Sequence, residues 1–221
     1  MTATTTWRAD PYTAALRAGR GPLFLRRDDG WLLPLEVERW CEAPDAADLS
    51  VLERCRGSVL DIGCGPGRLV AALTAEGRRA LGIDISPEAV ARAERLGAAA
   101  LCRSVFDPLP AEGRWETALL IDGNTGIGGD PASLLRRLRQ VVSRTGLVLA
   151  ECAPVDVDER CEVRVDDGRG GRGTPFPWAR VGARALSALA TRTGWSVSES
   201  WTVAARPFLS LVPHPSAPSS P

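Results

Sequence analysis

Short apolar runs alternate with amphipathic stretches along this chain, and the alternation predicts a series of strand–helix units. Strands are predicted where the runs are short and rich in β-branched residues, at about 59–62, 79–84, 98–104, 115–122 and 146–151. Helices are predicted directly after the first strand and where apolar residues recur at helical spacing, at about 87–96, 130–142 and 180–193. This order favours a parallel sheet with helices on both faces.

The two ends of the chain add further elements. The last two predicted strands, about 195–204 and 206–212, are joined too closely for a crossover and should pair antiparallel. Near the N-terminus a short helix at 11–18 precedes a hairpin of Leu23–Arg26 and Trp31–Leu33. We therefore predict an α/β fold with a seven-stranded, mostly parallel sheet, an antiparallel final strand, helices on both faces and a small N-terminal lid. The expected boundaries are 1–44 for the lid, 45–212 for the main domain and 213–221 for a disordered tail.

The turn after the first core strand carries the strongest chemical signal. Val59-Leu60-Asp61-Ile62 is followed by Gly63-Cys64-Gly65-Pro66-Gly67 and then by an apolar helix face. Glycines at alternate positions let the backbone turn sharply and approach a ligand closely. The turn therefore presents backbone N–H groups at a helix N-terminus, close to the carboxylate of Asp61.

Two cofactor fingerprints use such a turn. The dinucleotide motif G-x-G-x-x-G needs a third glycine where this chain has Arg68, whose long side chain cannot replace it in helix packing. The spacing Gly63, Gly65, Gly67 after Asp-Ile instead resembles motif I of the class I, Rossmann-like S-adenosylmethionine (SAM) methyltransferases. That resemblance covers about residues 55–212 and implies that the loop wraps the methionine end of SAM, with Asp61 helping to position its amino group.

A second acidic residue stands at the spacing that a nucleoside cofactor requires. Asp84 ends the next predicted strand, about 20 residues after the glycines, where a carboxylate accepts hydrogen bonds from ribose hydroxyls. Ser86-Pro87 then reads as a helix N-cap and first turn. The alternative is that Asp84 belongs only to the turn. The cofactor-binding residues expected from the resemblance are Asp61, Gly63, Cys64, Gly65, Gly67, Asp84, Ile85, Val105, Phe106 and Asp122.

The loop after the third predicted strand departs from the family pattern. The resemblance places Ser104 or Val105 where the family often has an aspartate for the adenine amino group. Adenine is then expected to meet backbone groups of Val105 and to pack on Phe106. Asp107 is an alternative acid, or it initiates the proline turn that follows.

Candidates for the acceptor side come from loops at the same edge of the sheet, because ligands of open parallel sheets bind beyond the carboxyl ends of the strands. The glycine-rich segment after the fourth strand contains Asp122 and Asn124, and Glu151 ends the fifth strand. With Tyr12 from the N-terminal lid, these four are the predicted catalytic residues. The segment lacks the D/N-P-P-Y/F signature of many nucleic-acid and protein methylating enzymes, which favours a small-molecule acceptor. The alternative is a glycine turn without chemical function.

Two segments are candidates for a lid over the cofactor and the acceptor. In the family, N-terminal extensions such as Trp7–Arg17 commonly fold over cofactor and acceptor. The glycine- and arginine-rich stretch 166–173 is either a lid for an acidic substrate or an exposed loop.

Composition narrows the function classes. The 27 basic residues are all arginine and balance 27 acidic ones, which argues against a duplex nucleic-acid or anionic-membrane partner. The absence of lysine excludes P-loop and Schiff-base chemistry, and the one histidine, His214, makes a triad or a metal site unexpected. The six cysteines form no C-x-x-C pair, and no signal peptide or membrane-spanning run is visible. We expect a cytoplasmic protein without a metal; no oligomeric state is predicted.

These features predict a SAM-dependent methyltransferase that acts on a small metabolite by in-line transfer, with S-adenosylhomocysteine as the other product. Three alternatives stay open: transfer of the aminocarboxypropyl group of SAM, a SAM-binding regulatory module without turnover, and a nicotinamide oxidoreductase.

Overall fold

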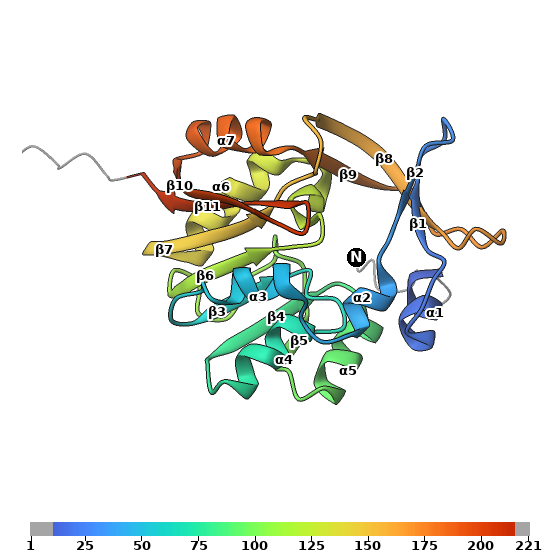
Figure 1. Ribbon diagram of the computed structural model, residues 1–221, viewed down its shortest axis with the longest axis horizontal. Helices are drawn as coiled ribbons and strands as arrows, with labels where there is room; N and C mark the ends of the chain where they lie inside the picture. Colours follow the sequence, from blue (N-terminus) through green and yellow to red (C-terminus); the bar gives the residue numbers. More distant parts are fainter. Residues whose placement is uncertain (1–10, 215–221) are drawn as a thin grey trace, which may run out of the picture.

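The computed structural model describes residues 11–214 and contains two β-sheets, as Figure 1 shows. The larger sheet has seven strands in the order β10-β11-β7-β6-β3-β4-β5. Their bounds are β3 Val59–Ile62, β4 Ala80–Asp84, β5 Ala100–Cys102, β6 Trp115–Leu120, β7 Val142–Glu151, β10 Trp195–Val203 and β11 Arg206–Pro213. Residues 1–10 and 215–221, including Trp7 and most of the predicted tail, lie outside the described part of the chain.

The pairing within this sheet confirms the predicted fold class. Strand β3 lies between β4 and β6 and pairs parallel with both, and β4–β5 and β6–β7 are also parallel. Strand β11 pairs antiparallel with both β7 and β10. The strand order changes direction at β3, so the crevice beyond the carboxyl ends of β3 and β6 is the expected position for a ligand.

Helices cover both faces of the large sheet. One face packs against α3 (Ala46–Leu52) and α4 (Arg68–Ala75), and the other against α6 (Pro131–Val141) and α7 (Ala183–Arg192). Alternate residues of β7 separate the two cores: Leu147 and Leu149 face the first, and Val148 and Ala150 face the second. This double burial explains why the central strands are continuous apolar runs.

Helix starts follow the sequence signals. Helix α5 (Pro87–Arg95) begins after Ser86, whose side chain accepts a hydrogen bond from the backbone N–H of Ala89. The side chain of Asp130 caps α6 in the same way, through Ala132 and Ser133. Both caps place a helix N-terminus at the edge of the sheet where the parallel strands end.

The second sheet has four antiparallel strands in the order β2-β1-β8-β9. The predicted N-terminal hairpin supplies β1 (Phe24–Arg26) and β2 (Leu32–Pro34). The sequence pattern missed the other two strands, β8 (Asp158–Asp166) and β9 (Phe176–Val181), and wrongly extended the last helix back to residue 180. The Gly/Arg-rich stretch 166–173 begins at the buried last residue of β8, Asp166, and continues as the partly exposed connection toward β9.

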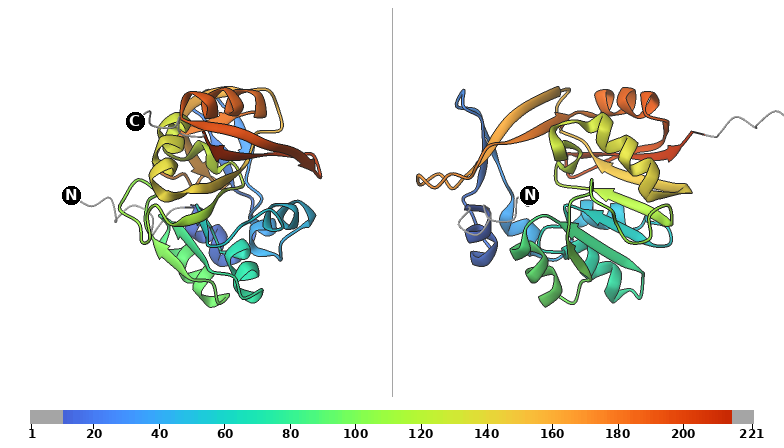
Figure 2. Two further views of the ribbon diagram at one scale, coloured as in Figure 1. Left: turned by 90° about the vertical axis from the view of Figure 1, so that its left-hand side faces the viewer. Right: turned by 180° about the vertical axis from the view of Figure 1, so that it is seen from behind.

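The small sheet and two helices form the cover at one end of the large sheet. Helices α1 (Pro11–Ala18) and α2 (Val37–Cys41) pack with the hairpin and with β8 and β9 around a separate apolar core, which also takes in Ala89 of α5. Figures 1 and 2 show these elements beyond one end of the seven-stranded sheet. The cover therefore combines an N-terminal segment with an insertion after β7.

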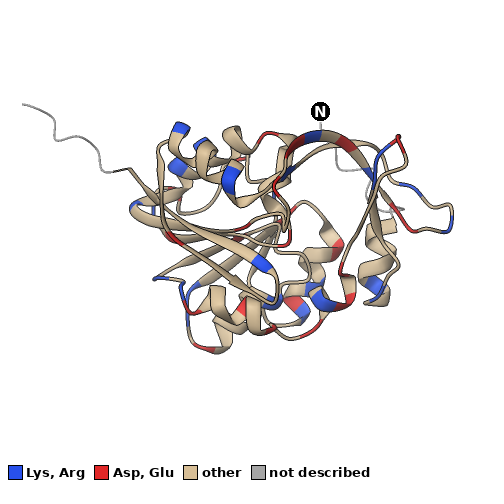
Figure 3. Cartoon of the chain, turned by 45° about the horizontal axis from the view of Figure 1, so that its top comes forward, with Lys and Arg blue, Asp and Glu red and all other residues tan. Residues whose placement is uncertain are grey.

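Two further features are the distribution of charged residues and the length of the helices. Acidic and basic residues are interspersed over the view in Figure 3, with no extended region of one sign. Within residues 11–214, no helix combines the length and apolar character needed to cross a membrane.

Candidate functional site

The glycine turn after β3 is built for close approach. Gly65 has φ +54°, and a Cβ added there would meet only the Tyr12 hydroxyl, at 3.9 Å, so the space in front of Gly65 is open. Gly67 has a different reason to be glycine, because a Cβ there would lie 2.5 Å from the Cβ of Ala93 on α5. One glycine thus leaves room for a ligand, and the other lets the loop and α5 pack together.

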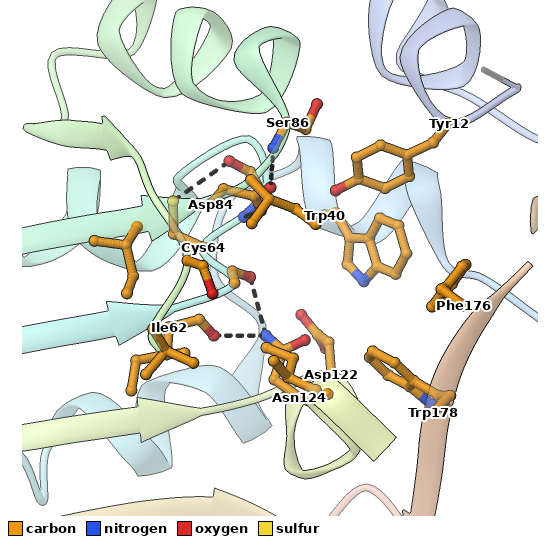
Figure 4. Close-up of a pocket in the computed structure, with 18 of the residues that line it drawn as sticks. Tyr12, Trp40, Ile62, Cys64, Asp84, Ser86, Asp122, Asn124, Phe176 and Trp178 are labelled. Carbon is orange, nitrogen blue, oxygen red and sulfur yellow. Dashed lines mark hydrogen bonds between the residues drawn. The ribbon is translucent and has the colours of Figure 1, made fainter. Parts of the chain in front are cut away.

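Asp84 holds this turn and faces the same space. Its Oδ2 accepts a hydrogen bond from Gly65 N at 2.9 Å, and its Oδ1 accepts one from Ser86 N at 2.8 Å, as Figure 4 shows. Burial raises the pKa of this carboxyl, and the backbone hydrogen bonds from Ser86 and Gly65 act against that rise. A carboxylate has about four acceptor positions, so Asp84 retains acceptor capacity for a ribose hydroxyl beside its backbone hydrogen bonds.

A cavity of about 360 Å³ extends from Asp84 to the small sheet. Two exposed apolar side chains line the end beside Asp84: Ile85 is 51% exposed and Phe106 46% exposed. Such a pair of apolar surfaces suits a flat base next to a diol. Val105 also lines the cavity, but its carbonyl accepts a hydrogen bond from Arg137 Nε at 2.9 Å. The other groups of Val105 are therefore the ones available to a ligand. Asp107 instead accepts a hydrogen bond from Ser104 N within its own turn.

Asn124 connects the glycine turn to the loop after β6. Its Nδ2 donates hydrogen bonds to the carbonyls of Ile62, at 2.8 Å, and Gly63, at 2.9 Å. A Cβ on Gly63 would lie 2.7 Å from that nitrogen, so Gly63 and Asn124 fit each other. Asn124 therefore fixes the position of the turn that carries Gly65.

The glycines of the same loop seat the small sheet. The 3₁₀ segment η2 (Asn124–Gly129) lies against β9, and a Cβ on Gly126 would be 2.2 Å from the Ala179 carbonyl and 2.7 Å from the Trp178 ring. A Cβ on Gly129 would lie 2.7 Å from the Cβ of Pro177. The glycine-rich sequence thus allows strand β9 to approach the mouth of the cleft.

Asp122 and Glu151 belong to a network of ion pairs. Asp122 is bound by three arginines: Arg39 at 2.6 Å, Arg68 at 2.9 Å and Arg206 at 3.3 Å. Glu151 accepts hydrogen bonds from the backbone N–H of Asp122 and from Arg206, both at 2.8 Å. Both carboxylates are therefore neutralised by guanidinium groups, which do not deprotonate in proteins.

The centre of this network is fully buried. Asp48 is inaccessible to solvent and accepts two hydrogen bonds from Arg68, at 2.8 and 3.0 Å. Burial acts to raise the pKa of Asp48, but hydrogen bonds and charge from Arg68 and Arg206 together lower it. Arg68 thus joins Asp48 on α3 to Asp122 at the cleft, which explains why an arginine follows the third glycine.

Asp61 lies beneath the turn and not on the cavity wall. It is 3% exposed, and burial raises its pKa to about 7, with Arg68 acting in the opposite direction and Asp122, Asp84 and Asp48 adding to the rise. Its influence on a ligand would pass through the loop above it.

The far end of the cavity is aromatic. Tyr12 and Trp40 lie 6.4 Å apart between ring centroids, and Phe176 meets Trp178 edge to face at 6.1 Å. Figure 4 shows these four rings on the side of the cavity opposite Ile62, Cys64 and Asp84. A second cavity of about 380 Å³ adjoins the first and shares Leu35, Trp40, Asp122 and Trp178 with it.

The structure brings most of the predicted site residues together. The first cavity is lined by Tyr12, Gly63, Cys64, Gly65, Asp84, Ile85, Val105, Phe106, Asp122 and Asn124. Glu151 lines the second cavity, while Gly67 and Asp61 lie behind the walls. Trp40, Phe176 and Trp178 were missed. The alternation of Phe176 and Trp178 with less apolar neighbours is a strand signal that could have found β9.

Comparison with known proteins agrees with this geometry. Residues 59–146 match the family model described as "Methyltransferase domain". A SAM-dependent methyltransferase from Bacteroides fragilis, solved in complex with S-adenosyl-L-homocysteine, shares 21% identity with a TM-score of 0.79, over 97% of each chain. The CcbJ methyltransferase from Streptomyces caelestis shares 14% identity with a TM-score of 0.64, over 97% of this chain and 100% of the other.

A third structure is similar over a shorter region. It is 1,6-didemethyltoxoflavin-N1-methyltransferase from Burkholderia thailandensis, at 17% identity, a TM-score of 0.58, and coverage of 77% of this chain and 78% of the other. Residues 59–146 are therefore similar to a methyltransferase domain, and the chain has the same fold as these solved methyltransferases.

Proposed function

We propose that this protein is a methyltransferase that uses SAM and passes its methyl group to a small molecule by in-line displacement. The observation that carries the proposal is Asp84, which holds the glycine turn and keeps acceptor capacity at a cavity that continues to an aromatic wall. A nucleoside needs the Asp84 carboxylate to bind its ribose hydroxyls, and the molecule that receives the methyl group needs the part of the cavity toward the aromatic wall.

The residues of the first cavity suit each part of the cofactor. Asp84 accepts hydrogen bonds from the ribose hydroxyls, and the exposed faces of Ile85 and Phe106 enclose the adenine. The backbone of Gly63 to Gly65 contacts the methionine end, where the missing side chain of Gly65 leaves room. Asn124 keeps that backbone in place through its two hydrogen bonds to Ile62 and Gly63.

Bound SAM supplies a methyl group that its sulfonium has already activated. The protein then has to align the acceptor and exclude water, which the small sheet and the aromatic wall do from opposite the glycine turn. Asp122 and Glu151 are paired with arginines, so we assign them a positioning role. Of the four predicted catalytic residues, Tyr12 is the one we propose to contact the acceptor, because its hydroxyl lies near Gly65.

A small-molecule acceptor is supported by the size and cover of the site. The second cavity, of about 380 Å³, is bounded by α2, β9 and the ends of β6 and β7. The similar Burkholderia enzyme is named for a small heterocyclic substrate. We also propose a cytosolic location, since six free thiols suit a reducing compartment.

Calorimetry with SAM, S-adenosylhomocysteine, NAD and NADP tests the cofactor. We expect the two sulfur nucleosides to bind and the two dinucleotides not to bind. Asp84→Ala should weaken S-adenosylhomocysteine binding more than tenfold, because the ribose diol loses its carboxylate acceptor. The control Asp107→Ala, outside the cavity, should leave the affinity unchanged. Preferential NAD binding would refute the proposal.

Turnover separates the remaining alternatives. Incubation with labelled SAM and a metabolite extract should give S-adenosylhomocysteine and a product heavier by one methylene unit. A product heavier by an aminocarboxypropyl group would identify the other transferase. Binding without S-adenosylhomocysteine formation from any extract would identify a regulatory module.

A further inference from the structure

The junction of the two cavities has a composition that restricts the acceptor. Leu35, Trp40, Asp122 and Trp178 line both cavities there. Leu25, Val165 and Phe176 continue the apolar surface into the first cavity. Aromatic and aliphatic walls of this kind favour a flat, apolar ligand, because ring faces gain most from stacking and burial.

The aromatic walls are held in place before any ligand binds. Trp178 rests against Gly126, where any Cβ would lie 2.7 Å from its ring, and it meets Phe176 edge to face. Trp40 packs against Tyr12. The rings therefore belong to a preformed slot, and a ligand in it does not have to order them.

The three arginines that line the second cavity are already paired with carboxylates. Arg39 binds Asp122 at 2.6 Å, and Arg206 binds Glu151 at 2.8 Å. Arg180 lies over the ring of Trp31 and 3.5 Å from Glu159. A charged acceptor between the aromatic walls would lose its hydration, and an anion would meet only arginines that already have carboxylate partners, which is unfavourable.

Two buried donors beside the slot form no hydrogen bond within residues 11–214: Arg39 Nη1, which lies 3.9 Å from an oxygen of Asp48, and Trp40 Nε1. Trp40 Nε1 is the one that belongs to an aromatic wall of the slot. Figure 4 shows this nitrogen on the edge of the indole that faces Asp122 and Trp178. A buried donor without an acceptor is unfavourable, so a ligand that brings an oxygen to it gains the hydrogen bond and removes the penalty.

We propose that the methyl acceptor is an uncharged, flat ring system that lies between Trp40 and Trp178 and accepts a hydrogen bond from Trp40 Nε1 through a ring carbonyl oxygen. This rests on the proposed function, because it takes the first cavity as the SAM site. A sugar does not fit the slot, since most of its hydroxyls would face apolar walls.

Four probes of graded chemistry test the proposal. They are 4-quinolone, quinoline (which lacks the carbonyl), kynurenate (which adds a carboxylate) and glucosamine. Their affinities are measured by calorimetry in the presence of saturating S-adenosylhomocysteine. We expect 4-quinolone to bind at least tenfold more tightly than quinoline and kynurenate, and glucosamine to give no measurable binding.

Trp40→Phe isolates the hydrogen bond, because it keeps the aromatic ring and removes the N–H. The variant should bind 4-quinolone and quinoline equally, with unchanged affinity for S-adenosylhomocysteine. The control Trp201→Phe lies on β10, stacked on Phe208, and should retain the tenfold preference. A role of Trp40 in packing alone would weaken both probes together and leave their ratio unchanged.

The proposal is overturned if kynurenate or glucosamine binds as tightly as 4-quinolone, if 4-quinolone does not bind, or if its preference over quinoline survives in Trp40→Phe. Normal binding of S-adenosylhomocysteine in these experiments means that only the acceptor assignment has failed. Loss of that binding in the wild-type protein would instead refute the proposed function.

Discussion

Asp61→Asn tests the electrostatics beneath the glycine turn. The Asp61 carboxyl is 3% exposed, and burial together with three nearby carboxylates outweighs Arg68 and raises its pKa to about 7. Asparagine has nearly the same shape as a protonated aspartic acid but cannot ionise. The substitution therefore removes the titration while preserving the packing at the end of β3.

The direction in which stability changes with pH follows from how many protons the folded and unfolded states bind. Between pH 4 and pH 7 the unfolded chain releases the Asp61 proton while the folded protein retains it, so ionisation favours unfolding and stability falls as the pH rises. The interval from the ordinary value of 3.8 to about 7 corresponds to about 4 kcal/mol. Asp48 acts in a different range, because its lowered pKa contributes stability that is lost only as the pH falls below about 4.

Urea denaturation of both proteins at pH 4.5 and pH 8 measures the effect. Asp61→Asn should exceed the wild type by only about 1 kcal/mol at pH 4.5 and by about 4 kcal/mol at pH 8, where the difference corresponds to about 8–16 °C in Tm. The control is Thr117→Val on the neighbouring strand β6, which removes a buried, uncharged hydrogen-bonding group and should change stability equally at both pH values. A difference for Asp61→Asn that stays constant with pH would refute the assignment.

Three further substitutions test the site and its support. Gly65→Ala should weaken S-adenosylhomocysteine binding at least tenfold in calorimetry. Gly77→Ala, at φ +74° with no atom within 4 Å of an added Cβ, should leave the affinity unchanged; equal losses of affinity in the two variants would mean that backbone strain alone is the cause. Asn124→Ala removes two hydrogen bonds to the glycine turn and should lower the unfolding free energy by about 1–3 kcal/mol, measured by urea denaturation; no change would refute its clamping role. Ala204 and Ala205 have φ +50° and +61° in the hairpin before Arg206, so Ala205→Gly should raise Tm by about 2–4 °C in calorimetric scans; an unchanged Tm would show no strain.

The large sheet could be predicted because each of its signals is local. The apolar run at Val59, the glycines that follow and the acid at Asp84 have fixed spacings along the chain, and each spacing follows from one strand–turn–helix unit. The residues at the ends of these strands meet because parallel strands end at the same edge. These local signals are enough to predict that Gly65, Asp84 and Phe106 lie at one edge of the sheet, and all three line the first cavity.

The small sheet could not be predicted in the same way. Strands β8 and β9 carry weak alternation, and they join the sheet through β8, which pairs with β9 on one side and on the other with β1, more than 130 residues earlier in the chain. Only this long-range pairing brings Trp178 opposite Asp84 and makes the seat for β9 on Gly126. The same limit applied to Asp122 and Glu151, whose proximity to Arg39, Arg68 and Arg206 depends on how separate elements pack.

The sequence by itself determined the order of strands and helices in the large sheet and the glycine–acid pair at the proposed cofactor end of the site, because periodicity and turn chemistry act between near neighbours. Tertiary structure decided the acceptor end. Side chains from α1, α2, η2 and β9 converge there. Arginines neutralise Asp122 and Glu151, the two carboxylates that the sequence predicts as catalytic, and the indole nitrogen of Trp40 has no hydrogen-bond partner within residues 11–214. Burial and charge pairing depend on the surroundings in three dimensions, and no local pattern encodes them.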